Sequence, residues 1–148
     1  MKCSRLGVLF AFMLSFLTPC FAHHLAVVVD KDNHVENITS THLAKIIRAD
    51  VKKWPDGKDI LIVLRRDLAG ETLTLQRLTK MSANELQAHI AAHSGMITLV
   101  DSDADVLKLV GSMPGAMGFV EVRGINDQVN VVKVDGKLPM ESGYLPHQ

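Results

Sequence analysis

Two short apolar runs constrain the fold more than any other feature of this chain. They are LAVVVD at residues 25–30 and ILIVL at residues 60–64. A strand that is apolar at nearly every position is typical of a sheet covered on both faces. A helical pattern separates the two runs. Strands that alternate with helices predict an α/β fold, here a three-layer single lobe with a mostly parallel sheet.

Four helical segments are predicted from apolar spacing and capping residues. Thr39 or Ser40 can cap the first, and ETLTLQRLTKM at 71–81 is the second. SANE at 82–85 is a capping box that begins the third, and SDAD at 102–105 caps the fourth. The positions expected to face the core are Leu43, Ile46, Ile47, Leu75, Leu78, Leu86, Ile90, Val106, Leu107, Val110 and Met113.

The stretch SMPGAMGFVEV at residues 112–122 marks a helix end that leads directly into a strand. Pro114 cannot continue a helix, and Gly115 can adopt a positive φ without steric cost. Gly118 allows another backbone to approach closely. The extended segments expected in the second half of the chain are 96–100, 117–122 and 129–134, with Asn126 and Asp127 in the last turn.

Residues 1–22 are predicted to be a cleaved secretory signal. A charged start is followed by an apolar run from Leu6 to Leu17, which is too short to span a bilayer comfortably. Ala22 provides the small residue before the cleavage site, and Pro19 before Cys20 argues against a lipoprotein signal. We therefore expect one domain, residues 23–148, that is periplasmic or secreted.

Charge and cysteine content exclude several function classes. The 16 basic residues are balanced by 16 acidic ones, and no basic stripe indicates nucleic acid. Cys3 and Cys20 both lie in the predicted signal, so the remaining domain has neither a disulfide nor a thiol nucleophile. No second apolar segment predicts a membrane span. No catalytic motif is found, so we expect a non-enzymatic protein without a cofactor or a bound metal.

The segment VLRRDLAGETLTL at residues 63–75 is the best candidate for a ligand site. It has the pattern of a strand, a polar glycine turn and the start of a helix. In α/β sheets ligands lie beyond the carboxyl ends of strands, where free N–H groups of helix N-termini attract anions. Arg65 or Arg66 could add a guanidinium to such a site. The structural alternative is an ordinary ion pair with Asp67 or Glu71.

Three segments resemble the phosphate-type solute-binding proteins of ABC transporters. PGAMGFV at 114–120 resembles their Pro-Gly-Ala-Ile-Gly-Tyr-Val segment, and LAVVVDKDNHV at 25–35 resembles their Val-Val-Val-Asn-Lys-Asp-Asn-Pro strand. THLAKIIRADVKKWPDGKDI at 41–60 resembles their helix-then-Trp segment, in which a glycine usually stands near Ala49 and Asp50. The order and spacing also match. The resemblance implies a periplasmic-binding-protein-like fold, one lobe of a normally two-lobed clamshell, and a small phosphate-like anion as partner.

The resemblance also implies the ligand-binding residues. The family turn Arg-Ser-Asp-Gly-Ser-Gly-Thr-Thr aligns without a gap on residues 65–72. Arg65, Asp67, Gly70 and Thr72 are its matching positions. The ligand-binding candidates are Arg65, Gly70 and Thr72 in this turn, with Thr39 and Ser40 at the start of the earlier helix.

Two departures from the family turn weaken the expected anion site. Ala69 replaces a binding serine, which removes a hydroxyl donor. Glu71 replaces a binding threonine and is expected to put a carboxylate where the anion would sit. The repulsion of two charges about 4 Å apart can cancel a good charged hydrogen bond. The alternative function is therefore an envelope protein-interaction module that has lost its ligand site.

Other motifs have both a structural and a functional interpretation. His89 and His93 have the i, i+4 spacing of a helical metal pair, but they flank an apolar stripe and are interpreted as boundary residues of the core. His23 would be the mature N-terminus, where an amine and an imidazole can hold copper. The aspartates of 101–105 lack the glycine and glutamate of a calcium loop, so capping is favoured. Trp54 is expected to pack against its own turn.

Overall fold

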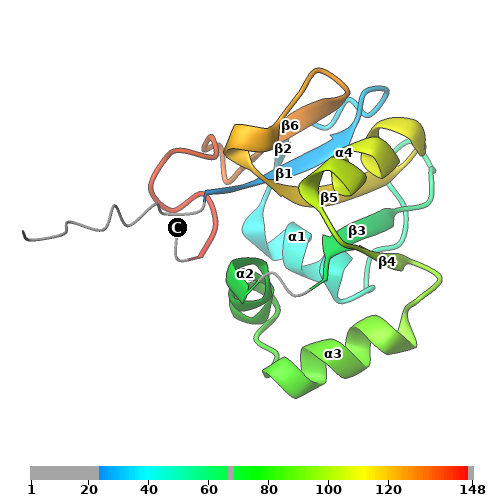
Figure 1. Ribbon diagram of the computed structural model, residues 1–148, viewed down its shortest axis with the longest axis vertical. Helices are drawn as coiled ribbons and strands as arrows, with labels where there is room; N and C mark the ends of the chain where they lie inside the picture. The colour runs from blue at the N-terminus through cyan, green and yellow to red at the C-terminus, as the bar shows by residue number, and fades with distance from the viewer. Residues whose placement is uncertain (1–23, 67–68, 147–148) are drawn as a thin grey trace, which may run out of the picture.

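A six-stranded sheet in the order β2-β6-β1-β5-β3-β4 forms the centre of the lobe (Figure 1). The computed structural model describes residues 24–66 and 69–146. The strands are β1 (Leu25–Asp30), β2 (Asn37–Ile38), β3 (Leu61–Arg65), β4 (Ile97–Val100), β5 (Ala116–Glu121) and β6 (Val129–Val134). The helices are α1 (Ser40–Ile47), α2 (Ala69–Thr79), α3 (Ala83–Ala92), α4 (Asp103–Ser112) and the short 3₁₀ helix η1 (Val122–Gly124).

Five of the six strands run in the same direction. β3 is parallel to β4 and to β5, and β2 is parallel to β6. β1 is antiparallel to both of its neighbours, β5 and β6, so these two neighbours run the same way as each other. The expected mostly parallel sheet is therefore confirmed. As a consequence, the carboxyl ends of β2, β3, β4, β5 and β6 all lie along one edge of the sheet.

The sheet is covered on both faces, as the two apolar runs predict. One face packs against α1, α2 and α3 through a cluster that includes Leu43, Ile47 and Leu75. The other face packs against α4 through a smaller cluster that includes Val28, Val63 and Val110. Figure 1 shows α4 on the opposite side of the strands from α1. All six residues of β1 are buried, as is typical of a central strand.

Local signals placed the helix starts correctly. Thr39 caps α1, where its side chain accepts a hydrogen bond from the His42 N–H. Ser82 and Glu85 form the expected capping box at α3, and Ser102 caps α4. Met113 was expected on the buried face of α4, and this is wrong. The helix ends at Ser112, Met113 has an extended backbone, and its side chain is 38% exposed.

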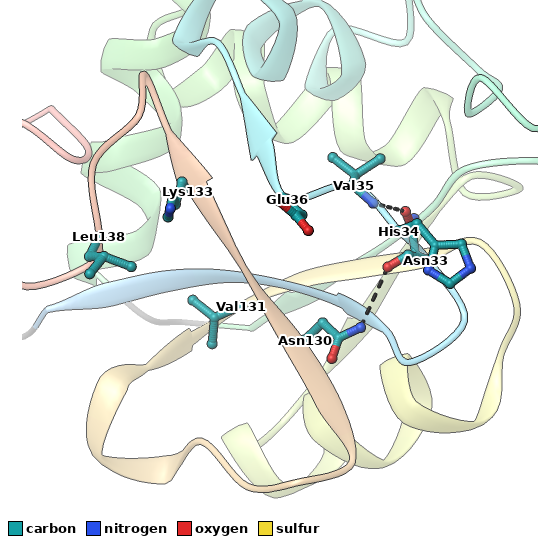
Figure 2. A pocket seen from close by; sticks show the side chains of 8 residues that line it. All are labelled: Asn33, His34, Val35, Glu36, Asn130, Val131, Lys133 and Leu138. Carbon is teal, nitrogen blue, oxygen red and sulfur yellow. Dashed lines mark hydrogen bonds between the residues drawn. The ribbon is translucent and has the colours of Figure 1, made fainter.

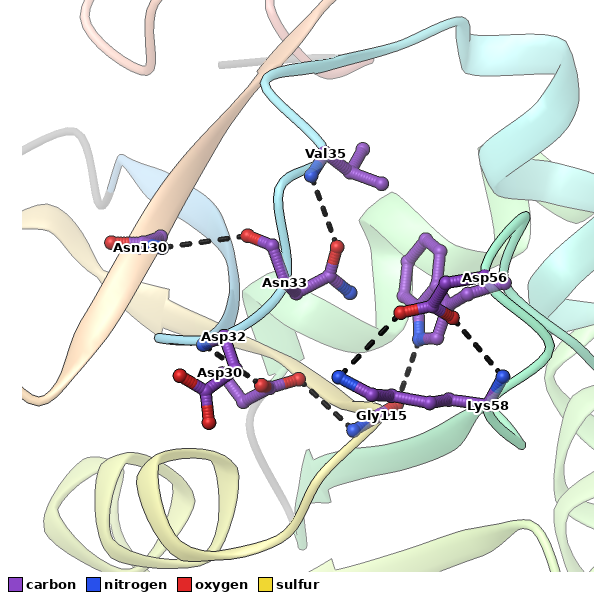
Figure 3. Close-up of polar contacts among 9 residues, drawn as sticks. Asp30, Asp32, Asn33, Val35, Asp56, Lys58, Gly115 and Asn130 are labelled. Atoms are coloured by element: carbon purple, nitrogen blue, oxygen red, sulfur yellow. Dashed lines mark hydrogen bonds and ion pairs between the residues drawn. The ribbon is translucent and has the colours of Figure 1, made fainter.

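Gly115 is fixed by hydrogen bonds and by a lack of space for a side chain at the junction of α4 and β5. Its N–H donates to Oδ2 of the buried Asp30 at 3.0 Å (Figure 3), and its carbonyl accepts from Trp54 Nε1 at 2.9 Å. Its φ is +82°, and a Cβ there would lie 2.1 Å from the Asp59 carbonyl oxygen. Only glycine fits this conformation and this space. The expected role of Gly115 is confirmed. Trp54, which was expected to pack against its own turn, is buried in the main core cluster and reaches Gly115.

Gly118 has the close backbone approach that the sequence predicts. A Cβ at this position would lie 2.9 Å from the Val63 carbonyl oxygen and 2.7 Å from Val106 Cγ1. Strand β5 therefore approaches both β3 and α4 closely at this point. Ala49, which lies in the segment where the resemblance implies a nearby glycine, has a φ of +62° at the end of α1. The left-handed backbone explains why glycine suits this position.

The C-terminal segment returns to the start of the sheet. Tyr144 is 1% exposed, and its hydroxyl accepts from the Val27 N–H at 2.9 Å and donates to the Val132 carbonyl at 2.7 Å. These two residues are the last opposed pair of the β1 and β6 ladder. The hydroxyl thus bridges the two strands where their pairing ends. Burial raises the pKa of Tyr144 to about 12, so the hydroxyl keeps its proton and its donor role.

Candidate functional site

The expected ligand-binding residues all lie at the carboxyl edge of the sheet. β2 leads into the start of α1, which contributes Thr39 and Ser40. β3 ends at Arg65, and α2 begins with the turn that contains Gly70 and Thr72. Within the described residues no hydrogen bond or ion pair joins the first pair to the other three. The edge therefore carries two separate groups of candidates, and Asp67 lies outside the described residues.

Arg65 is held by two carboxylates, one at its backbone and one at its side chain. Its N–H donates to Glu71 Oε1 at 3.1 Å, and its Nη1 donates to Asp103 Oδ1 at 3.1 Å. Asp103 begins α4, and its Oδ2 accepts from the Glu121 N–H. The side chains of Arg65 and Asp103 are 24% and 20% exposed. Among the described residues, this guanidinium therefore pairs with Asp103 and not with Glu71, whereas the other expected partner, Asp67, lies outside the described residues. The exposed Arg66 pairs with Asp101 instead.

Glu71 points into the lobe and is only 1% exposed. Burial raises its pKa to about 8, and the nearby Asp103 charge adds to this, whereas the Arg65 N–H and guanidinium oppose it. The side chain is therefore mostly protonated at neutral pH. In this protonation state Glu71 repels an anion less than the charged carboxylate that the sequence suggests. The reason is that the side chain is buried against the backbone of Arg65 rather than exposed at the helix start.

Two buried polar atoms at this site have no hydrogen-bond partner within the described part of the chain. They are Arg65 Nε and Glu71 Oε2. Both residues line a cavity of about 150 Å³ between the end of β3, the start of α2 and α3. Thr72 also lines it, and Leu75, Leu86 and Ile90 provide an apolar wall. Buried polar atoms without partners are uncommon, and here they lie beside the residues that the sequence assigned to ligand binding.

At the start of α1 the chain supplies its own carboxylate. The Ser40 N–H donates to Asp135 Oδ1 at 2.9 Å, and Asp135 directly follows β6. Thr39 uses its hydroxyl as the helix cap. Sequence reasoning missed both Asp103 and Asp135 as partners of the site. Their separations from Arg65 and Ser40, 38 and 95 residues, leave no local signal of these contacts.

The remaining candidates have structural contacts. His89 Nε2 bonds to the Ile47 carbonyl and His93 Nδ1 to the His89 carbonyl, at 2.7 and 2.8 Å. Residues 24–66 and 69–146 contain no group of three or more side chains placed to hold a metal ion. His23 and the predicted signal, residues 1–22, lie outside the described residues. Among the described helices, none is long and apolar enough to cross a membrane.

A larger hollow of about 420 Å³ lies at the outer side of β6, between this strand and residues 33–36. Figure 2 shows Glu36, Val131 and Lys133 around it, with the Asn130 amide bonded to the Asn33 carbonyl. None of the expected ligand-binding residues lines this hollow. Its position therefore does not support it as the anion site that the sequence predicts.

Comparisons with known proteins bear on the fold and the family of this chain. The phosphate-binding protein PstS of Bacillus subtilis is 29% identical over 120 residues, which cover 78% of this chain and 37% of that protein. A crystal structure of an ABC-type phosphate transport receptor from Vibrio cholerae shares 19% identity and a TM-score of 0.63, over 78% of this chain and 48% of the other. A putative phosphate ABC transporter substrate-binding protein from Clostridium perfringens, solved with bound phosphate, shares 25% identity and a TM-score of 0.64.

The chain spans less than half the length of these relatives, with 46% of the Clostridium perfringens protein covered. The structural matches, which cover 78% of this chain, support its fold. A family model described as a PBP superfamily domain matches residues 16–145. Because this match covers most of the chain, the chain belongs to the PBP superfamily.

Proposed function

We propose that this chain is an exported, non-enzymatic solute-binding module that takes phosphate or a similar small oxyanion at the carboxyl edge of its sheet, in a transport or sensing context. Family membership supports solute binding, and the phosphate-binding relatives support this class of ligand. The comparisons lend no support to the alternative of an envelope protein-interaction module.

One observation carries the proposal: Arg65 lies beside the start of α2, next to a Glu71 that is mostly uncharged at neutral pH. The guanidinium supplies donors for an oxyanion, and the first N–H groups of an 11-residue helix add a favourable field. A protonated Glu71 does not oppose an anion by its charge. Its carboxyl group can also donate a hydrogen bond, which a carboxylate cannot.

The same contacts set the expected affinity. A ligand at Arg65 competes with Asp103, which already holds the guanidinium, and Asp135 already holds the Ser40 N–H. Breaking a charged hydrogen bond to make another gains little free energy. We therefore expect dissociation constants in the millimolar range, about 4 kcal/mol weaker than micromolar binding.

Calorimetric titration with phosphate and with sulfate at low salt tests the proposal. Arg65→Gln should remove binding, because it removes the guanidinium at the site. Lys108→Gln is the control, since it removes the same unit of charge from an exposed residue that does not line the cavity beside Arg65. Melting curves check that both variants are folded. An absence of heat with the unmodified chain at about 10 mM phosphate, or equal binding by the two variants, would contradict the proposal.

Export is tested separately. If residues 1–22 are a cleaved signal, protein recovered from the exported fraction of its host should begin at His23. Mass spectrometry of the intact chain measures this directly. A chain that still begins at Met1 would rule out the cleavage, without affecting the ligand site.

A further inference from the structure

A second groove, of about 450 Å³, lies between α1 and α2. Its lining includes four exposed cationic side chains and two hydroxyl side chains, Ser40 and Thr41, but no carboxylate side chain. The four cations are Lys45, Arg48, Arg77 and Lys80. The chain as a whole has equal numbers of acidic and basic residues. The four cations therefore give this groove a local positive charge, although the net charge of the whole chain is zero.

The described part of the chain provides no carboxylate partner for these cations. Lys45, Arg77 and Lys80 take part in none of its ion pairs. Arg48 is fixed differently, because its Nε and Nη2 both donate to the Thr79 carbonyl, at the end of α2. A cation near a helix C-terminus is individually favourable. Like charges that share one groove nevertheless repel one another, and a bound anion would relieve this repulsion.

This groove is separate from the cavity beside Arg65, although Ser40 at the carboxyl edge also lines it. Lys80 lies ten residues beyond Gly70, which corresponds to about 15 Å along a helix axis. The contact of Arg48 with Thr79 places the cationic part of the groove at the far ends of α1 and α2. No residue lines both this groove and the cavity beside Arg65. The proposed site at Arg65 therefore does not explain the cations of this groove.

The groove fits a soluble anion with several charged groups better than a single phosphate or a membrane. Its cations come from two helices, so one phosphate group cannot neutralise all of them, whereas a chain of linked phosphate groups can. Its volume is in the range of pockets that hold small molecules. Membrane-docking surfaces combine cations with exposed large hydrophobic side chains. None of the exposed large hydrophobic side chains of the described residues lines this groove.

We propose that the groove between α1 and α2 binds a soluble condensed phosphate through Lys45, Arg48, Arg77 and Lys80. This site is additional to the proposed site at Arg65 and does not depend on it. Binding is expected to follow the number of linked phosphate groups. It is also expected to weaken strongly with salt, because all four cations are exposed.

Calorimetry with inorganic tripolyphosphate, pyrophosphate and phosphate, free of divalent cations, tests the proposal on the purified chain. Tripolyphosphate should bind most tightly. The double variant Lys45→Gln, Arg77→Gln should weaken its binding about tenfold or more. The control double variant Lys108→Gln, Lys133→Gln removes the same charge from exposed positions outside the groove and should leave the binding unchanged.

Arg65→Gln separates the two sites. It should leave tripolyphosphate binding intact even if it removes phosphate binding at the edge. Loss of tripolyphosphate binding in Arg65→Gln but not in the groove variant would overturn the proposal. Equal weakening in the groove and control variants would also overturn it, since net charge alone would then explain the binding. Binding to vesicles of anionic lipid without any binding of tripolyphosphate would exclude a soluble ligand.

Discussion

Replacement of Glu71 by glutamine should stabilise the protein progressively as the pH rises. The pKa of Glu71 is raised from 4.5 to about 8, chiefly by burial. Below pH 4.5 the carboxyl is protonated in both the folded and the unfolded chain, and its contribution to stability is fully present. Between pH 4.5 and 8 the unfolded chain releases the proton while the folded chain keeps it, so stability falls. At about 1.4 kcal/mol per pH unit, the whole loss is about 5 kcal/mol.

Glutamine has nearly the same shape, keeps an oxygen that can accept from the Arg65 N–H, and does not titrate. Urea unfolding at pH 5, 7 and 9 measures the outcome. The free energy of unfolding of Glu71→Gln minus that of the unmodified chain should increase by about 3–5 kcal/mol between pH 5 and pH 9. Glu85→Gln is the control, because Glu85 is exposed and its pKa is lowered by its hydrogen bonds to Ser82. A constant difference between Glu71→Gln and the unmodified chain across this range would refute the reasoning.

Four further substitutions probe the backbone and the C-terminal segment. Gly115→Ala should lower the free energy of unfolding by about 2 kcal/mol or more, because the Cβ would clash with a carbonyl. Gly136→Ala, with a similar φ of +77° and nothing within 4 Å, should cost only about 1 kcal/mol; equal melting temperatures would contradict this. Tyr144→Phe should cost about 2–3 kcal/mol and speed hydrogen exchange at the Val27 amide, since both bridged backbone groups lose their partner. Ala49→Gly should raise the free energy of unfolding slightly, by up to about 1 kcal/mol, because glycine relieves the left-handed backbone, and urea unfolding measures this.

The parts of the fold that depend on neighbouring residues could be predicted from the sequence. The run at 25–30 forms a fully buried strand because each of its side chains is apolar or has a buried partner. Ser82 and Glu85 begin a helix because their side chains satisfy each other's backbone N–H groups. The reversed direction of β1 could not be predicted, because its partners are far away in the chain: Leu25 lies opposite Glu121. The two-residue strand β2 is too short to produce a pattern.

The site was predictable only as a location. The glycine turn after an apolar strand indicated the start of α2, and the structure has Arg65, Gly70 and Thr72 there. The charge state of Glu71 was not predictable, because a sequence does not show whether a carboxyl points outward or into the lobe. Asp103, as the partner of Arg65, depends on the parallel pairing of β3 and β4, which brings the starts of α2 and α4 to the same edge.

The central position of β1 has a consequence for the order in which the lobe can form. β1 is the first strand of the chain, but its two neighbours are the last two, and its end is bridged by Tyr144. During synthesis from the N-terminus, this largely apolar strand therefore has no partner until about 90 further residues have followed. Folding limited by such distant contacts is slow. A fragment that ends before residue 116 lacks both strand partners of β1, so it should stay unfolded and bind chaperones. The whole chain, by contrast, completes its sheet in one late step.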